Sequence, residues 1–242
     1  MVCTTIKKRV FWIILIALLQ ACGGKAENPQ ISDLCSSPPD IALTDIQSVV
    51  DWINAMEKPL TLPCFIQSLP RPLKIQPAYS EFSAQPSPNA GSPRIFFFFD
   101  RLILTVAVDQ DFAEMPYPLL EMSYLVDEPN LITTKAELKF PIVETLSAGS
   151  PYQGLSFNER ISQCSFCHPR ESIRETIEDQ PVYQSTMLRP TTPQPVERLH
   201  QENAACQTSR EPHRCAMLGS IVDHGELVPF QFPAGAPTIF DN

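Results

Sequence analysis

The segment ISQCSFCHPRE, residues 161–171, holds the side chains of this protein whose types and spacing could do chemistry. Cys164 and Cys167 are three positions apart, and His168 follows the second cysteine directly. Two thiols at this spacing can exchange with disulfides, bind a metal ion, or form thioethers with the two vinyl groups of a porphyrin. In the last case the adjacent imidazole is placed to bind the iron.

Cys164-Ser165-Phe166-Cys167-His168 resembles the C-x-x-C-H haem-attachment motif of c-type cytochromes, and the resemblance is confined to this short segment. It implies a covalently bound haem c, with Cys164 and Cys167 as thioether sites and His168 as the proximal ligand. Cytochromes c usually have a glycine soon after the histidine, whereas Pro169 follows here.

A distal ligand must come from downstream if the haem is six-coordinate. Met217 is the candidate that we expect, because it lies 49 residues after His168, a span that suits a distal methionine. A thioether would raise the reduction potential above that given by a second histidine. The packing interpretation of Met217, in the apolar segment RCAMLGSIV, remains open, as does a five-coordinate haem. The other downstream candidates are Met187, His200, His213 and His224.

Three other interpretations of the cysteine pair stay open. A thioredoxin-like dithiol follows a strand and opens a helix, whereas a helical pattern precedes this pair and a proline follows it. A zinc site could add Cys206 or Cys215 as a ligand, but a second C-x-x-C or an H-x₃-H is missing from the sequence. The pair could also be a short disulfide or free thiols in a structural lipoprotein.

The N-terminus predicts export and lipidation. Lys7 to Arg9 is basic, Val10 to Leu19 is an unbroken apolar run, and Leu19-Gln20-Ala21-Cys22 follows. The run is too short for a membrane-spanning helix, so residues 1–21 are expected to be a signal peptide. The last four residues resemble the lipobox of bacterial lipoproteins. This implies acyl chains such as palmitate on Cys22, and Gly23 in place of aspartate implies an outer-membrane lipoprotein facing the periplasm.

Charge and cysteine content fit an exported domain. The chain has 18 Lys and Arg against 27 Asp and Glu, and three of the basic residues lie in the signal, so the mature balance of 15 to 27 argues against nucleic-acid binding. Without Cys3 and Cys22, six cysteines remain, and an even set in an oxidising compartment is expected to be paired. The simplest of the possible schemes pairs neighbours and leaves only Cys164 and Cys167: Cys35 with Cys64, and Cys206 with Cys215.

The elements that must position the motif can be read from hydrophobic spacing. Residues 44–58 predict a helix with a Thr44–Gln47 capping box, and the proline-rich residues 59–93 predict a loop or extended connector. Residues 94–144 predict about four antiparallel strands, with the phenylalanine run in the core. In the last strand, Ala136, Leu138 and Phe140 are expected to be buried, and Lys135, Glu137 and Lys139 exposed.

The C-terminal part is expected to be helical and irregular. Ser156 and Glu159 predict a capping box for a short helix ending at Pro169, with Cys164 and His168 on one face. The expected fold is therefore α+β, with an N-terminal helix, a small antiparallel sheet and a proline-rich C-terminal part bearing C-x-x-C-H. The expected divisions are a signal over 1–21, a lipidated tether over 22–43, a helix plus sheet over 44–150, and the motif region over 151–242.

These observations favour a lipid-anchored periplasmic c-type haem protein that transfers electrons to a redox partner protein or senses through haem. The alternative is a disulfide-stapled envelope lipoprotein without a cofactor, acting by binding or structure. A carrier or binding protein is favoured over an enzyme, because G-x-S-x-G, H-E-x-x-H and a glycine-rich phosphate loop are all missing from the sequence.

Overall fold

The computed structural model describes residues 35, 37–79, 85, 87, 89, 91–108, 118–168 and 170–241. The predicted signal peptide, the lipidated Cys22 and most of the tether lie outside these residues. None of the helices in the described part is long and apolar enough to cross a membrane.

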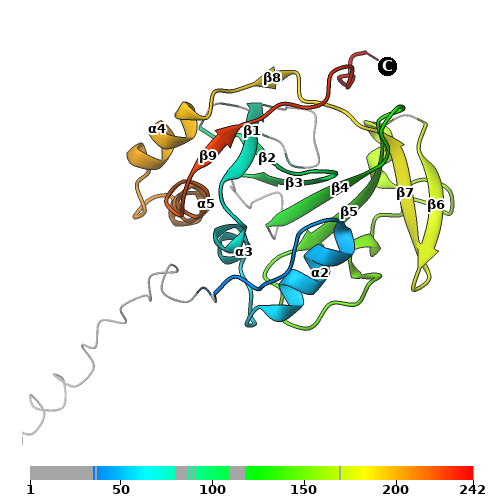
Figure 1. Cartoon of the computed structure of the whole chain (residues 1–242), viewed down its shortest axis with the longest axis horizontal. Coiled ribbons are helices and arrows are strands. Elements are labelled where there is room, and N and C mark those ends of the chain that lie inside the picture. Colours follow the sequence, from blue (N-terminus) through cyan, green and yellow to red (C-terminus); the bar gives the residue numbers. More distant parts are fainter. Residues whose placement is uncertain are drawn as a thin grey trace, which may run out of the picture. The chain divides into compact units, whose positions relative to one another are not determined.

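A nine-stranded sheet forms the body of the α+β fold (Figure 1). Its strands follow the order β6-β7-β5-β4-β3-β2-β1-β8, and β9 pairs with β1. All pairs are antiparallel except β1 with β9, which is parallel. The strand bounds are β1 Leu73–Tyr79, β2 Arg94–Phe99, β3 Leu102–Ala107, β4 Leu119–Asp127, β5 Ile132–Lys139, β6 Ser172–Ile177, β7 Gln180–Thr186, β8 Thr192–Pro193 and β9 Leu227–Pro229.

The predicted strands over 94–144 are confirmed as β2 to β5, and the phenylalanine run is in the core as expected. The β2–β3 hairpin turns at Asp100 and Arg101, where Asp100 takes the left-handed conformation that a tight turn requires. Successive phenylalanines of β2 point to opposite faces of the sheet and both sets are buried, with Phe97 on one face and Phe96 and Phe98 on the other. The sheet therefore has an apolar layer on each side.

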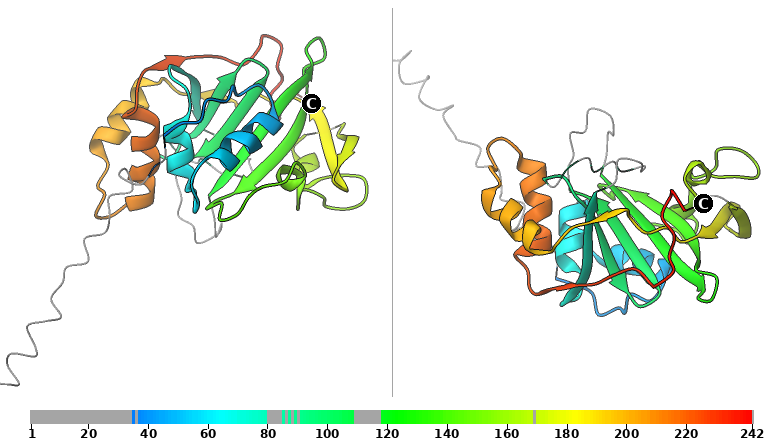
Figure 2. Two further views of the ribbon diagram at one scale, coloured as in Figure 1. Left: turned by 60° about the horizontal axis from the view of Figure 1, so that its bottom comes forward. Right: turned by 90° about the horizontal axis from the view of Figure 1, so that it is seen from above.

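Helices cover one face of the sheet and one end of it (Figure 2). Helices α2 (Ile46–Ala55) and α3 (Leu62–Ser68) pack their apolar residues against the inward side chains of β2, β3, β4 and β5 in one large core. Helix α5 (Pro212–Val222) packs against α3, and α4 (Glu197–Ala205) packs against α5, at the end of the sheet where β1 runs. The hairpin of β6 and β7 lies at the other end, as the strand order requires.

The N-terminal helix is present, but its predicted cap was wrong by one residue. Asp45 is the N-cap, and its side chain accepts a hydrogen bond from the Ser48 N–H. The Ser48 hydroxyl in turn accepts a hydrogen bond from the Asp45 backbone N–H. Asp45 and Ser48 therefore form the reciprocal capping box that was assigned to Thr44 and Gln47.

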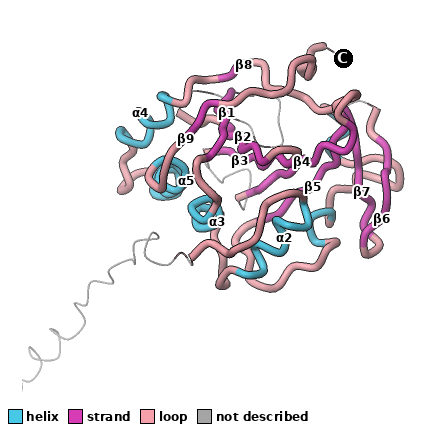
Figure 3. Tube along the Cα trace, viewed as in Figure 1, coloured by secondary structure: helices cyan, strands magenta, loops and turns pink. Residues whose placement is uncertain are grey.

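Two of the predicted segment boundaries also differ from the structure. Residues 59–93 hold α3 and β1 and are not a plain connector, because the proline at the start of α3 occupies the helix position that needs no backbone N–H. The C-terminal part contributes α4 and α5, as expected, and also strands β6 to β9 (Figure 3). The expected division between residues 150 and 151 therefore falls inside a single sheet with a shared core.

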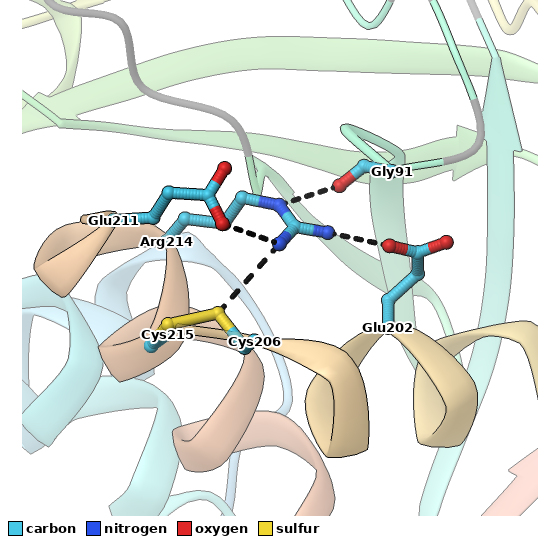
Figure 4. Close-up of a disulfide and its surroundings, with 6 residues drawn as sticks. All are labelled: Gly91, Glu202, Cys206, Glu211, Arg214 and Cys215. Carbon is cyan, nitrogen blue, oxygen red and sulfur yellow. Dashed lines mark hydrogen bonds and ion pairs between the residues drawn. A yellow bond between two sulfur atoms is a disulfide. The ribbon is translucent and has the colours of Figure 1, made fainter. Parts of the chain in front are cut away.

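Both predicted disulfides are present in the structure. Cys35 is bonded to Cys64 of α3, so the bridge closes a loop around α2, and Cys206 is bonded to Cys215 between α4 and α5. Arg214 reinforces the second bridge (Figure 4). Its guanidinium pairs with Glu202 at 2.7 Å, donates to the Gly91 carbonyl at 2.7 Å, and reaches Cys206 Sγ at 3.6 Å.

Candidate functional site

The second face of the sheet carries the residues around the C-x-x-C-H motif. Because strand register is known, side chains of this face fall into rows across β2, β3, β4 and β5. Running from β2 to β5, the first row holds Phe96, Thr105, Glu121 and Glu137. The second row holds Phe98, Ile103, Ser123 and Lys135. This half-polar surface is the floor of a cavity of about 470 Å³, a volume typical of cofactor and small-molecule sites.

Three segments that are distant in sequence cover this cavity floor. They are the motif loop from Leu155 to His168, the stretch from Met187 to Thr191 after β7, and the C-terminal stretch that includes Phe232 and Phe240. Cys164, Cys167 and His168 all line the cavity. The structure therefore brings the three predicted motif residues together at one cavity, as the haem interpretation requires.

The predicted helix over 156–168 was wrong in its first half. The Asn158 side chain accepts hydrogen bonds from the backbone N–H groups of Arg160 and Ile161, which holds residues 158–161 in a turn. A short 3₁₀ helix, η3 (Gln163–Phe166), then begins at the cap Ser162. The His168 N–H donates to the Cys164 carbonyl at 2.8 Å, so the expected sharing of one face by Cys164 and His168 survives in this turn.

Glu171 holds the motif loop in place, and it was missed by sequence reasoning. Its carboxylate accepts hydrogen bonds from both the N–H and the hydroxyl of the fully buried Ser162, at 2.6 and 2.7 Å. The Ser162 hydroxyl in turn accepts the Cys164 N–H at 2.9 Å. A second anchor is the 2.8 Å hydrogen bond between the hydroxyls of Ser156 and Tyr183. The loop is thus fixed to β7 and to the segment before β6.

The imidazole of His168 is held in one neutral tautomer. Its Nδ1 lies 3.2 Å from the Thr186 carbonyl oxygen, which can only accept, so Nδ1 carries the proton and Nε2 keeps its lone pair. Burial, with a contribution from the charge of Lys135, lowers the pKa of His168 to about 3. The ring is therefore uncharged at neutral pH, and a neutral imidazole whose second nitrogen donates to a carbonyl is the usual form of a metal ligand.

The two motif cysteines are free thiols and partly buried. Burial raises the pKa of Cys164, although the hydrogen bond from Ser162 and the charge of Lys135 act in the opposite direction. A raised thiol pKa does not favour a redox-active dithiol, whose attacking cysteine needs thiolate character. This observation counts against the thioredoxin-like interpretation.

Two cations, the partly buried Arg94 and the buried Lys135, lie on the cavity floor. Arg94 of β2 forms an ion pair with Glu121 of β4, and burial lowers the pKa of Arg94 to about 10. Lys135 of β5 is only 7% exposed, and burial lowers its pKa to about 8, so it is charged at neutral pH. Sequence reasoning placed Lys135 on an exposed strand face, and this was wrong because the motif loop covers that face.

The structure does not bring Met217 to the cavity. Met217 is 1% exposed in α5 and belongs to the core shared with α3. Met187, which directly follows the Thr186 carbonyl that binds His168, lines the cavity instead. The other downstream histidines, His200, His213 and His224, lie in or next to α4 and α5 and are not among the cavity-lining residues.

The zinc interpretation gains no ligand set from the described residues. The cysteines proposed to complete such a site, Cys206 and Cys215, are bonded to each other. Within the described part of the chain, no group of three or more His, Cys, Asp or Glu side chains is arranged to hold a metal ion.

Aromatic side chains at the cavity mouth are unusually exposed. Phe166, between the two motif cysteines, is 73% exposed, and Phe240 is 69% exposed. Phe166 also stacks edge-to-face on the exposed Phe157, with ring centroids 5.3 Å apart. Exposed large apolar side chains gathered around an opening mark a surface that a ligand or partner covers.

Comparisons of the chain with protein-family models, with curated proteins and with solved structures each give no significant match.

Proposed function

We propose that this protein is a lipid-anchored periplasmic c-type haem protein, with haem c attached at Cys164 and Cys167 and electron transfer or haem-based sensing as its role. The observation that carries the proposal is the combination of the C-x-x-C-H spacing with the state of His168. The imidazole is neutral and donates Nδ1–H to the Thr186 carbonyl, which leaves Nε2 for a metal.

The side chains around the cavity fit a haem in two respects. Both thiols are unbridged and lie at the cavity with the imidazole. The exposed Phe166 and Phe240 offer apolar surface at the mouth of the same cavity. When bound, haem supplies a one-electron couple whose potential depends on the axial ligands, on nearby hydrogen bonds and on burial.

The residues of the chain have three roles toward the haem, which are attachment, orientation and exclusion of water. Cys164 and Cys167 form the covalent bonds, and Ser162 and Glu171 set the position of the loop that bears them. Thr186 orients the ring of His168. Phe96, Ile103 and Phe232 line the cavity with apolar surface and so exclude water from it.

We propose Met187 as the distal-ligand candidate in place of Met217. A thioether at position 217 would have to leave the core beside α3, whereas Met187 already lines the cavity. Met187→Ala is expected to change the visible spectrum of the haem-loaded protein. Met217→Ala is expected to lower stability by about 2–5 kcal/mol without a spectral change, and the opposite pattern would restore Met217 as the ligand.

The test of attachment is expression of the full chain with a cytochrome c maturation system. We expect a Soret band and a sharp reduced α-band that survive acid-acetone extraction, and their loss in Cys164→Ala/Cys167→Ala. His200→Ala is a matched control, because this histidine lies on α4 away from the cavity. A colourless protein would remove the proposal.

The membrane anchor is proposed separately and rests on the sequence of the signal and on Cys22. Replacement of Cys22 with serine is expected to release the protein from the membrane fraction. If the variant stays membrane-bound, the lipid anchor is wrong while haem attachment is unaffected.

The cofactor-free alternative has one favouring observation, which is the presence of two structural disulfides, one joining the segment before α2 to α3 and the other joining α4 to α5. It predicts that Cys164 and Cys167 remain thiols, or bond to each other, in protein from the native host. Thiol labelling with and without reduction separates these states from two thioethers, which do not react in either condition.

A further inference from the structure

Lys135 is a buried cation with no acidic partner in the described part of the chain. Its ammonium donates to the Thr133 hydroxyl at 2.7 Å, and no carboxylate of the described residues lies within ion-pair distance. Buried charges in proteins are normally paired, because removing an ion from water costs several kcal/mol. The position of Lys135 in the cavity wall gives that charge access to a ligand.

The neighbouring carboxylates on the same face are held by other groups. Glu121 is paired with Arg94. Glu171 accepts the hydrogen bonds of Ser162 through its two oxygens and acts on Lys135 through its charge, without forming an ion pair with it. Glu137, two residues along β5, has its pKa raised by burial and is acted on by the charge of Lys139. None of these acids neutralises Lys135 by direct contact.

The apolar part of the cavity lining fits the apolar body of a ligand, and Lys135 fits an anionic group at the end of that body. Its walls include Phe96, Ile103, Met187 and Phe232, while Lys135 stands on the floor. Ser123 lies directly opposite Lys135 on β4, so a hydroxyl donor is available beside the ammonium. A planar carboxylate can accept hydrogen bonds from the ammonium and the hydroxyl at the same time.

We propose that Lys135 binds a carboxylate of a ligand whose apolar body fills the cavity. This chemistry has two possible sources, a propionate of haem c or a free long-chain carboxylate. The first rests on the proposed function and deepens it. The second is independent of haem attachment, because it requires only the cavity and the ammonium.

The experiment uses the Cys164→Ala/Cys167→Ala chain, which cannot form thioethers, with Lys135 either kept or changed to methionine. Methionine matches the lysine stem in volume and removes the buried charge, so the variant is expected to fold, as thermal melting checks. Two ligand pairs differ only in the carboxylate: hemin against hemin dimethyl ester, and dodecanoate against dodecanol. Binding is measured by absorbance titration for the first pair and by calorimetry for the second.

Two outcomes support the proposal and identify the source. If haem is the source, hemin binds about tenfold or more tightly than its ester, and Lys135→Met removes this preference. If a free carboxylate is the source, the same dependence appears for dodecanoate over dodecanol. Lys135→Arg is expected to keep the preference, and Lys139→Met, at an exposed position of the same strand, to leave it unchanged.

The proposal is overturned if neither pair shows a carboxylate preference, or if the preference survives Lys135→Met. Failure of the proposed function is a separate result. It is seen as the lack of covalent haem on the unaltered motif, and dodecanoate binding by the cysteine-free chain does not depend on it.

Discussion

Replacing Glu171 with alanine tests how the motif loop is held, since this carboxylate accepts both polar hydrogens of the buried Ser162. A hydrogen bond to a charged group contributes about 1.5–3 kcal/mol, and two at the low end of this range give about 3 kcal/mol. Local opening of residues 155–168 need not unfold the sheet, so the loss is expected in the loop's own stability.

Hydrogen–deuterium exchange of the peptide covering residues 155–168 is the assay. Every 1.4 kcal/mol is a factor of ten, so Glu171→Ala is expected to exchange about 100-fold faster at the protected amides of this segment. Glu171→Gln keeps one carbonyl acceptor but loses the charge, and roughly tenfold acceleration is expected. Amides of β3, in the centre of the sheet, should exchange at unchanged rates in both variants.

Glu175→Gln is the matched control, because Glu175 lies on neighbouring β6 in an exposed ion pair with Arg174. Such surface pairs contribute little, and the loop peptide is expected to exchange as in the parent protein. If Glu171→Ala and Glu175→Gln give the same exchange in residues 155–168, the reasoning that Glu171 positions Cys164 through Ser162 is refuted.

Two further predictions concern stability. Loop-closure entropy for sequence separations of 29 and 9 gives about 3.6 kcal/mol for the Cys35–Cys64 bridge and about 2.6 kcal/mol for Cys206–Cys215. Urea unfolding of the two double-alanine variants should therefore show the larger loss in free energy of unfolding when the Cys35–Cys64 bridge is removed. The reverse order would contradict the expectation that the longer loop gives the more stabilising disulfide. In haem-free protein, the pKa of His168 falls from 6.5 to about 3 on folding, so the unfolded chain binds the extra proton as pH drops below about 6.5. Between pH 7 and pH 4 the parent should lose about 3 kcal/mol more stability than His168→Gln. Parallel curves of unfolding free energy against pH for the two proteins would show that burial does not lower the pKa of His168.

Hydrophobic spacing was sufficient for the elements with regular alternation. The helix over 44–58 and the four strands over 94–144 were predicted because their apolar residues repeat at helical or strand periods. Neighbour pairing of cysteines gave both disulfides, because close sequence neighbours in a compact domain are also close in space. The motif residues were likewise found from their spacing alone.

The cavity floor could not be predicted because alternation tells which residues share a face, but not what covers that face. Lys135 and Glu137 alternate with buried Ala136 and Leu138, which is the usual pattern of a strand with one side in water. In the fold, the motif loop closes over this polar side. The available signal was a lysine on β5, an interior strand of the sheet, at a position opposite a serine on β4.

The predicted helix before the motif was wrong for a local reason. Ser156 and Glu159 match a capping box, but Asn158 takes the backbone N–H groups of Arg160 and Ile161 into a turn. Side chains of this type compete with the helix for the same hydrogen bonds, and the competition is invisible to a spacing rule. The Thr186 carbonyl, which accepts the His168 ring proton, is a backbone group. Every residue has such a carbonyl, so the sequence could not predict this hydrogen bond.

The most direct test of the central claim is the intact mass of the mature protein purified from its native host. Attachment through Cys164 and Cys167 predicts a chain heavier by one haem, and a peptide spanning residues 161–171 that retains the added mass after digestion. A mass that the polypeptide and its N-terminal acyl chains account for in full would contradict the account.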